Sequence, residues 1–294
     1  MVTEHESEAP LPRVGPPRQV LGPVAVGDDP RRMWRLAYTL ASTDFKLKFF
    51  GSALGYLWQL LNPLMLFGVL YLVFSFALNL DGGVRFFPVA LLLGLVMFMF
   101  FSEATSMSVR SLLAREPLVR KVDFPRLAVP LSTVMTAVFN FGLNLVAVLV
   151  FLLLAGAPVR WTWLFFPLVL LVLIIFTFGL AAMLSVSFVR FRDIEPIWAV
   201  LLQIGFYASG VFFTFDLIAG QKHGQTIVDV LLCNPFAAIL ATARHVLIDP
   251  SWKAPWAEMS SPWLMLIPAG IVVASVTAGL LVFRAQAPRV AEEL

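Results

Sequence analysis

Long apolar blocks separated by short polar segments dominate the pattern of this 294-residue chain. A helix needs about 20 apolar residues to cross the ~30 Å hydrocarbon core of a membrane, because each helical residue advances by ~1.5 Å. Six blocks are long enough, and they predict helices over approximately residues 56–79, 86–107, 127–154, 163–188, 196–215 and 262–283. The pattern therefore predicts an all-α integral membrane protein with six transmembrane helices.

The part of the chain before the first span consists of two segments of different composition. Residues 1–29 are rich in proline and acidic residues and contain no apolar run, so they are predicted to form a flexible cytoplasmic tail rather than a signal peptide. Residues 30–50 mix arginine and lysine with aromatic side chains, which is typical of an interfacial amphipathic helix. Gly51 and Gly55 then permit a sharp turn into the first span, because glycine adopts backbone angles that other residues avoid.

Composition and charge agree with a membrane bundle. Hydrophobic residues make up 60% of the chain, charged residues make up 13%, and the mean hydropathy is +0.87. A soluble domain of this size has no means of burying so much apolar surface. When the N-terminus is placed inside, 16 of the 21 Lys and Arg residues fall on the inner side, which predicts that both termini are cytoplasmic. The pI of about 9.2 therefore reflects membrane topology, and no nucleic-acid partner is expected.

The outer segment between the fifth and sixth spans, residues 216–261, is long and partly apolar. Its stretch CNPFAAILATARHVL has a helical pattern but is too short to cross the membrane. A re-entrant or surface-lying helical hairpin that starts after Pro235 is therefore predicted. Residues 51–285 are predicted to form one transmembrane domain, and residues 286–294 a cytoplasmic tail.

Several kinds of catalytic site are missing from the sequence. No glycine directly precedes a lysine, so there is no P-loop, and no G-x-G sequence is present to bind a dinucleotide. The three histidines are scattered, and Glu103 is the only ionisable residue close to the interior of a predicted span. We therefore expect no catalytic residue, metal or cofactor in this chain, and the energy for any uphill transport must come from a partner.

Three segments, in this order, resemble the permease subunit of ABC-2 type exporters. They are GSALGYLWQLLNPL at residues 51–64, LVRKVDFPRLAVPL at residues 118–131, and FRDIEPI at residues 191–197. The first is similar to the family's S-x-L-G-x-x-W-x-x-L-x-P-L segment, and the second to its cytoplasmic K-x-x-F-P segment before the third span. The resemblance extends over about residues 30–285 and is strongest to the polysaccharide branch, which exports lipid-linked O-antigen, teichoic acid or galactan.

This resemblance implies a homodimer of the chain in the inner or plasma membrane, carrying two copies of a nucleotide-binding ABC ATPase that holds ATP and Mg²⁺. The expected cargo is a lipid-linked polysaccharide that moves outward. Within the family, the alternative cargo is a drug or a free lipid. Outside the family, two alternatives are a structural scaffold and a membrane-embedded transferase that uses Asp193 and Glu195, the only close pair of carboxylates within residues 51–285.

The resemblance places substrate access beside the Leu-Gly loop that follows the interfacial helix. The corresponding residues are Lys46, Lys48, Gly51, Leu54, Gly55 and Trp58. The family often has several basic residues where this chain has LKFFGS, so attraction of a pyrophosphate here rests on the two lysines and on Arg35. The alternatives are that the lysines anchor the chain to anionic lipids, that the glycines serve only the turn, and that the tryptophan is an interfacial anchor.

The cytoplasmic loops are expected to receive the motion of the ATPase. The candidate coupling residues are Arg115, Glu116, Arg120, Lys121, Arg192 and Asp193. The alternative is that these loops are basic only because cytoplasmic loops generally are.

The fifth predicted span carries the candidate channel lining. Gln203 and Tyr207 are four residues apart and share a helix face, with Phe206 and Phe213 nearby, and Tyr71 of the first span is a further candidate. Aromatic rings and polar edges suit a sliding glycan, although these rings would also suit a lipid-facing surface. Asn140 and Asn144, also four apart, are predicted to form hydrogen bonds across helices.

Overall fold

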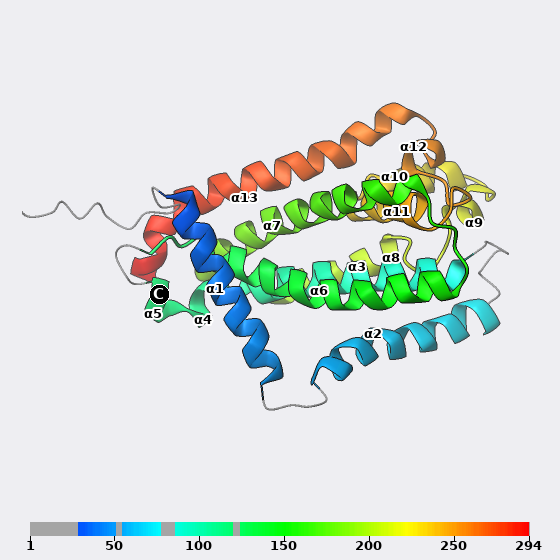
Figure 1. The fold of residues 1–294 in the computed structure, drawn as a ribbon. Coiled ribbons are helices and arrows are strands. Elements are labelled where there is room, and N and C mark those ends of the chain that lie inside the picture. Colours follow the sequence, from blue (N-terminus) through cyan, green and yellow to red (C-terminus); the bar gives the residue numbers. More distant parts are fainter. Residues whose placement is uncertain (1–28, 51–54, 78–85, 120–123, 294) are drawn as a thin grey trace, which may run out of the picture.

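The computed structural model describes residues 29–50, 55–77, 86–119 and 124–293, and within these ranges every regular element is a helix (Figure 1). The long helices are α1 Pro30–Phe49, α2 Gly55–Tyr71, α3 Phe87–Val109, α6 Ala128–Leu154, α7 Phe166–Arg190, α8 Ile194–Ala208, α11 Pro235–Leu247 and α13 Leu266–Glu293. The shorter ones are η1 Leu72–Ala77, α4 Ser111–Ala114, α5 Glu116–Val119, η2 Trp161–Phe165, α9 Phe215–Ala219, α10 Gly224–Leu232, α12 Pro255–Glu258 and η3 Pro262–Met265. This confirms the predicted all-α membrane fold.

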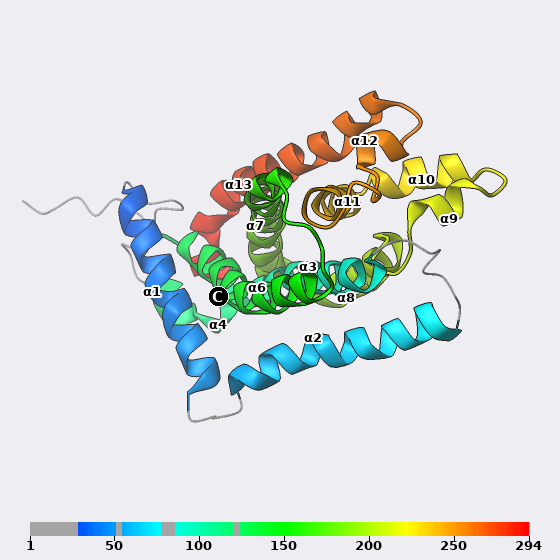
Figure 2. The ribbon, with the colours of Figure 1, turned by 45° about the vertical axis from the view of Figure 1, so that its right-hand side comes forward.

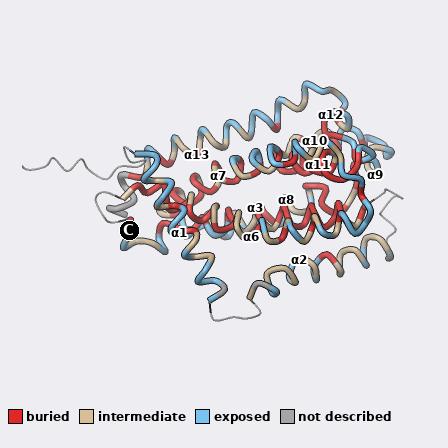
Figure 3. Tube along the Cα trace, in the orientation of Figure 1, coloured by how far each residue is buried: buried red, intermediate tan, exposed pale blue. Residues whose placement is uncertain are grey.

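Helix α3 forms the centre of the bundle. It is apolar around most of its circumference, as expected for a helix surrounded by protein, and 72% of its apolar window is buried. It contacts α2, α6, α7 and α8, and it lies within the buried part of the molecule in Figure 3. The core of the protein is therefore built around the second predicted span.

Helix α2 stands apart from this core. Only 6% of the window Leu57–Ser75 is buried, although the helix contacts α3 and α6 at one side. Figures 1 and 2 both show it as an outlying rod beside the bundle. Its apolar side chains are therefore left for lipid or for another protein chain.

Five helices in the described residues are long and apolar enough to cross a membrane, and a bent pair brings the number to six. The predicted fifth span differs from expectation. It is the 15-residue helix α8, which ends at Ala208 rather than near residue 215. At ~1.5 Å per residue it extends about 22 Å, less than the ~30 Å core. The helix stops because the chain turns at Gly210, whose φ is +70°.

The bent pair is the segment predicted to be a hairpin between the fifth and sixth spans. Helices α10 and α11 meet at 97°. Helix α11 begins at Pro235, where the side chain of Asn234 accepts a hydrogen bond from the backbone N–H of Phe236 at 3.0 Å. The start of the helix agrees with the prediction, whereas its depth in the membrane stays a prediction.

The two ends of the described chain lie at the same end of the bundle, on the left of Figure 1. Helix α1 crosses this end obliquely and packs against α6, burying Ala37 and Ala41. Its position on a membrane surface stays a prediction. Helix α13 continues to Glu293, so most of the predicted tail over 286–294 is helical.

Candidate functional site

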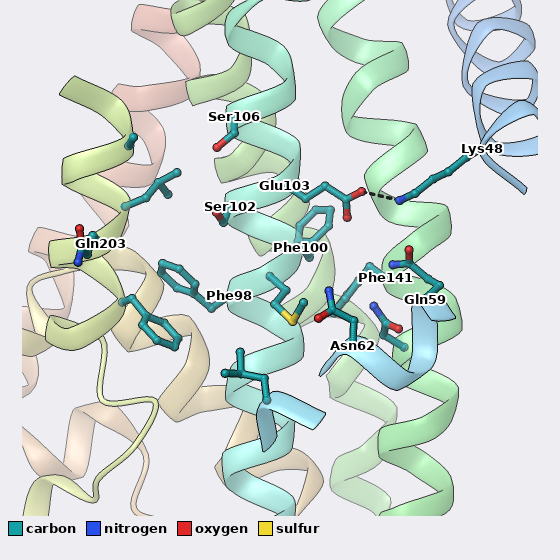
Figure 4. Close-up of a pocket in the computed structure, with 16 residues that line it drawn as sticks. Lys48, Gln59, Asn62, Phe98, Phe100, Ser102, Glu103, Ser106, Phe141 and Gln203 are labelled. Carbon is teal, nitrogen blue, oxygen red and sulfur yellow. Dashed lines mark hydrogen bonds and ion pairs between the residues drawn. The ribbon is translucent and has the colours of Figure 1, made fainter. Parts of the chain in front are cut away.

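A cavity of about 580 Å³ lies between the end of α1 and helices α2, α3, α6 and α8 (Figure 4). Its lining combines charged, amide, hydroxyl and aromatic side chains. The lining residues are Lys48, Gln59, Asn62, Leu66, Phe98, Met99, Phe100, Ser102, Glu103, Ser106, Phe141, Asn144, Ala199, Leu202, Gln203 and Phe206.

A charged group and an amide converge on one carboxylate at the cavity wall. Lys48 Nζ, at the end of α1, donates to Glu103 Oε1 on α3 at 3.1 Å. Asn140 Nδ2, on α6, donates to the same oxygen at 2.6 Å. Glu103 is therefore held by two different helices, and the dashed line in Figure 4 marks its pair with Lys48. The hydrogen bond confirms the prediction that Asn140 bonds across helices.

Uncharged polar groups surround this pair. Gln59 and Asn62 come from the first turns of α2, Ser102 and Ser106 from α3, and Gln203 from α8. Asn144 lies one turn beyond Asn140 on α6, is only 5% exposed, and its Oδ1 accepts no hydrogen bond from the part of the chain that the structure describes. A buried amide oxygen without a partner is energetically costly, whereas the exposed amides of Asn62 and Gln203 are open to a ligand hydroxyl.

Aromatic rings form the rest of the wall. Phe98 and Phe206 have ring centroids 4.8 Å apart and connect α3 to α8. Phe100 and Phe141 are 4.9 Å apart and connect α3 to α6. The cavity thus pairs apolar ring faces with several polar groups, which is the usual composition of a site for a small organic ligand.

Three of the residues predicted for substrate access or channel lining meet at this cavity: Lys48, Gln203 and Phe206. The others lie elsewhere. Tyr207 lies beside Phe206 and is 61% exposed. Tyr71 stacks on Phe67, with ring centroids 5.7 Å apart. Phe213 packs edge-on against Phe215 among the outer helices. Lys46 and Trp58 are exposed and outside the cavity lining, and Gly55 is the first residue of α2. Gly51 and Leu54 lie outside the described residues.

Ion pairs connect the segments at the end of the bundle where α1 lies. Arg115, at the end of α4, pairs with Asp44 of α1. Arg110, which follows α3, donates to Glu195 in the first turn of α8 at 2.6 Å. Glu116 is half-buried in α5, and Arg192 and Asp193 are exposed before α8. Arg120 and Lys121 fall outside the described ranges.

The sequence profile of the family described as ABC-2 type transporter matches residues 35–248. This chain belongs to the ABC-2 type transporter family. The O-antigen export system permease protein RfbA of Klebsiella pneumoniae is 27% identical over 218 residues, which is 74% of this chain and 82% of the relative. RfbA of Myxococcus xanthus is 28% identical over 214 residues, or 73% and 80% of the two chains. The polysialic acid transport protein KpsM of Escherichia coli is 27% identical over 211 residues, or 70% and 78%.

This ABC-2 chain carries its cavity entirely within the family region. The lining residues run from Lys48 to Phe206, and the two ion pairs at the end of the bundle also fall between residues 35 and 248. Helix α13, by contrast, lies beyond the matched residues. The match confirms the resemblance expected from the three sequence segments and identifies a multi-pass membrane protein.

Sequence reasoning missed several residues that the fold brings together. Glu103 stood out only as a charge near a span, and the roles of Asp44, Arg110 and Glu195 in interhelical pairs were not predicted. Glu195 had been paired with Asp193 as a possible catalytic site, but its carboxylate is bound to Arg110 instead. Glu103 could have been found from the sequence because it is a single carboxylate in an apolar block. No local sequence pattern points to the ion pairs of Asp44, Arg110 and Glu195.

Proposed function

We propose that this chain is the membrane permease subunit of an ATP-driven exporter that moves a lipid-linked polysaccharide from the cytoplasmic side outward. The observation that carries the proposal is the family match, together with relatives named for O-antigen export and polysialic acid transport. These names favour a polysaccharide over the alternative of a drug or a free lipid. The glycan proposed is of the O-antigen, teichoic acid or galactan type.

The chain works as a transport subunit, and a separate ABC ATPase, present in two copies, binds ATP and Mg²⁺. Both termini lie in the cytoplasm, and the protein resides in the inner or plasma membrane. The distribution of Lys and Arg and the common position of α1 and the end of α13 support this orientation.

Substrate access takes place at the junction between α1 and α2. Lys46, Lys48, Gly51, Leu54, Gly55 and Trp58 form the access segment in this proposal. The position of Lys48 on the cavity wall supports the proposal, because the lipid-pyrophosphate end would arrive beside the space that the glycan enters.

The ion pairs at the cytoplasmic end support a route for coupling. ATP binding on the partner moves the segment that contains Arg115, Glu116, Arg120 and Lys121, and the pair of Arg115 with Asp44 passes this motion to α1. A second route runs from Arg110 through Glu195 into α8, beside the exposed Arg192 and Asp193. Both routes end at elements that line the cavity.

A homodimer completes the channel. Exposed apolar side chains cover α2, η1 and α8, including Val69, Leu72, Val200, Ile204 and Tyr207. A second copy of the chain covers these surfaces, and a channel along the dimer axis is lined by Tyr71, Gln203, Phe206, Tyr207 and Phe213.

The test is purification of the tagged permease from its native membrane, followed by identification of bound subunits and measurement of ATPase activity. We expect a P-loop ATPase in equal amount. The double variant Arg115→Ala/Glu116→Ala should retain the ATPase but uncouple its hydrolysis from export. A permease that purifies without any ATPase would contradict the exporter mechanism.

A further inference from the structure

The charges of the cavity cancel. Of its lining residues that the structure describes, only Lys48 and Glu103 are charged, and they form a direct pair at 3.1 Å. Their side chains are 41% and 26% exposed, so the carboxylate is the more enclosed of the two. The space beside them is therefore close to neutral, with a negative group fixed in its wall.

The carboxylate of Glu103 is fixed rather than free to swing away. It accepts hydrogen bonds from Lys48 and from Asn140, which lie on two different helices. An anionic group that enters the cavity would therefore lose water without gaining an unpaired positive charge, because Glu103 already neutralises Lys48. A charge that leaves water without a counter-charge is disfavoured, whereas an uncharged sugar does not meet this cost.

The remaining walls suit uncharged sugar rings. Gln59, Asn62 and Gln203 supply amide groups to the lining, and Ser102 and Ser106 supply hydroxyls. These groups donate to and accept from hydroxyls without favouring either charge. The rings of Phe98 and Phe206 supply apolar faces for sugar C–H groups.

We propose that the cavity holds uncharged sugar units and that Glu103 is the residue that discriminates against acidic ones. This inference rests on the proposed function, because it assigns a substrate class to the cavity of a glycan exporter. It makes Glu103 a specificity-determining residue and gives Lys48 a second role, which is to hold that carboxylate in place.

The experiment compares two soluble probes of similar size, a neutral galactose trimer and a sialic acid trimer. Saturation-transfer NMR measures their binding to the full-length chain in lipid nanodiscs. The wild type should bind the neutral trimer at least about tenfold more tightly than the acidic one, because the acidic trimer would lose water in the cavity without gaining a counter-charge. Glu103→Gln should reduce this preference about tenfold, and Lys48→Gln should increase it.

Two control variants separate charge from other effects. Asp29→Asn also removes one carboxylate, but at the start of α1 and outside the cavity lining. Asparagine caps a helix as well as aspartate does, so the helix should be retained. This variant should leave the preference for the neutral trimer unchanged. Ser106→Trp puts bulk into the cavity and should abolish binding of both probes.

The proposal is overturned by equal binding of both trimers to the wild type, by an unchanged preference in Glu103→Gln, or by binding that survives Ser106→Trp. Absence of binding by the neutral trimer also overturns it. None of these outcomes affects the co-purification of an ATPase, so failure of this inference is distinct from failure of the exporter proposal.

Discussion

The Nε of Arg110 lies 2.6 Å from Oε2 of Glu195, and this pair joins the end of α3 to the first turn of α8. Helix α8 contributes four residues to the cavity wall: Ala199, Leu202, Gln203 and Phe206. Leu202 is its only buried residue, and Trp198 Nε1 donates to Thr105 Oγ1 of α3 at 3.0 Å. A displacement of the segment after α3 would therefore reach this wall of the cavity through the ion pair.

Charge reversal at either end of this pair should impair export more than it impairs folding. Both side chains are substantially exposed, and exposed ion pairs contribute about 0–1 kcal/mol to stability. We expect Arg110→Glu and Glu195→Arg each to lower glycan export in cells while ATPase activity and the melting temperature stay near wild type.

The double variant Arg110→Glu/Glu195→Arg restores an attractive pair and serves as the control. It should recover most of the export that each single variant loses. Additive losses in the double variant would show that the two residues act independently.

The helix positions followed from the apolar pattern because a membrane imposes a minimum length on each span. The end of α8 did not follow, since apolar residues continue past Ala208 to Phe215. The turn at Gly210 is supported by Arg244, a residue 34 positions away. Hydropathy carries no information about such a distant support.

The cavity was only partly predictable for a similar reason. A spacing of four places Gln203 and Tyr207 on neighbouring parts of a helix surface, but it does not say which helix they meet. Gln203 reaches the cavity and Tyr207 does not line it. Likewise, Glu103 stood out in the sequence, but its partners Lys48 and Asn140 are 55 and 37 residues away.

Two glycines allow α7 and α13 to pack backbone to backbone, and we expect both to resist substitution. A Cβ at Gly179 would lie 2.8 Å from the backbone of Val276, and a Cβ at Gly279 would lie 2.2 Å from the carbonyl oxygen of Gly179. Helices would have to separate, at a cost of about 1–3 kcal/mol or more for each Gly→Ala change. Thermal unfolding of the purified variants should show a lowered melting temperature.

Gly270 is a matched control on the same helix, α13. No atom lies within 4 Å of a Cβ built there. Gly270→Ala should therefore be neutral or stabilising by about 0.5–1 kcal/mol, because alanine favours helix more than glycine does. A destabilised Gly270→Ala variant would mean that helix packing is not what distinguishes the three sites.

Glu258, in the outer segment, should make stability depend on pH. Burial away from water, and then the nearby carboxylate of Asp216, raise its pKa to about 7, although Lys253 opposes this. An unfolded glutamate titrates near ~4.3, so the folded state binds a proton more tightly. Stability from this group is therefore lost as the pH rises from about 4.5 to about 7.

Glu258→Gln mimics the protonated form and should raise the melting temperature more at pH 8 than at pH 5.5. Asp229 provides a contrast of opposite sign. The carboxylate of Asp229 accepts hydrogen bonds from Ser260 and Gln225, which stabilise its charged form. Asp229→Asn should therefore lower the melting temperature at pH 8. Equal effects of Glu258→Gln at the two pH values would contradict the proton linkage.

Arg244 stabilises the turn at which α8 ends. Of the substitutions discussed, we expect its replacement to destabilise the folded protein most. Its guanidinium donates to the carbonyl oxygens of Gly210 and Val211 at 2.8 Å each and to that of Ala90 at 3.3 Å, and it lies 4.9 Å from the ring centre of Trp252. Only 3% of the residue is exposed, so water cannot replace it.

Arg244→Ala would remove the donor from the carbonyls of Gly210 and Val211, at about 1–3 kcal/mol for each buried group, whereas the Ala90 carbonyl keeps its helical hydrogen bond within α3. Arg244→Lys should recover only part of the loss, because an ammonium lacks the planar fork that reaches three acceptors at once. Thermal unfolding and yield of folded protein measure both variants. Arg160 is the control, since it is one-third exposed and makes a single 3.3 Å contact with Asp249; Arg160→Lys should change the melting temperature little. If Arg244→Lys were as stable as the wild type, a simple positive charge would suffice at this position, and the guanidinium geometry would not be what supports the turn.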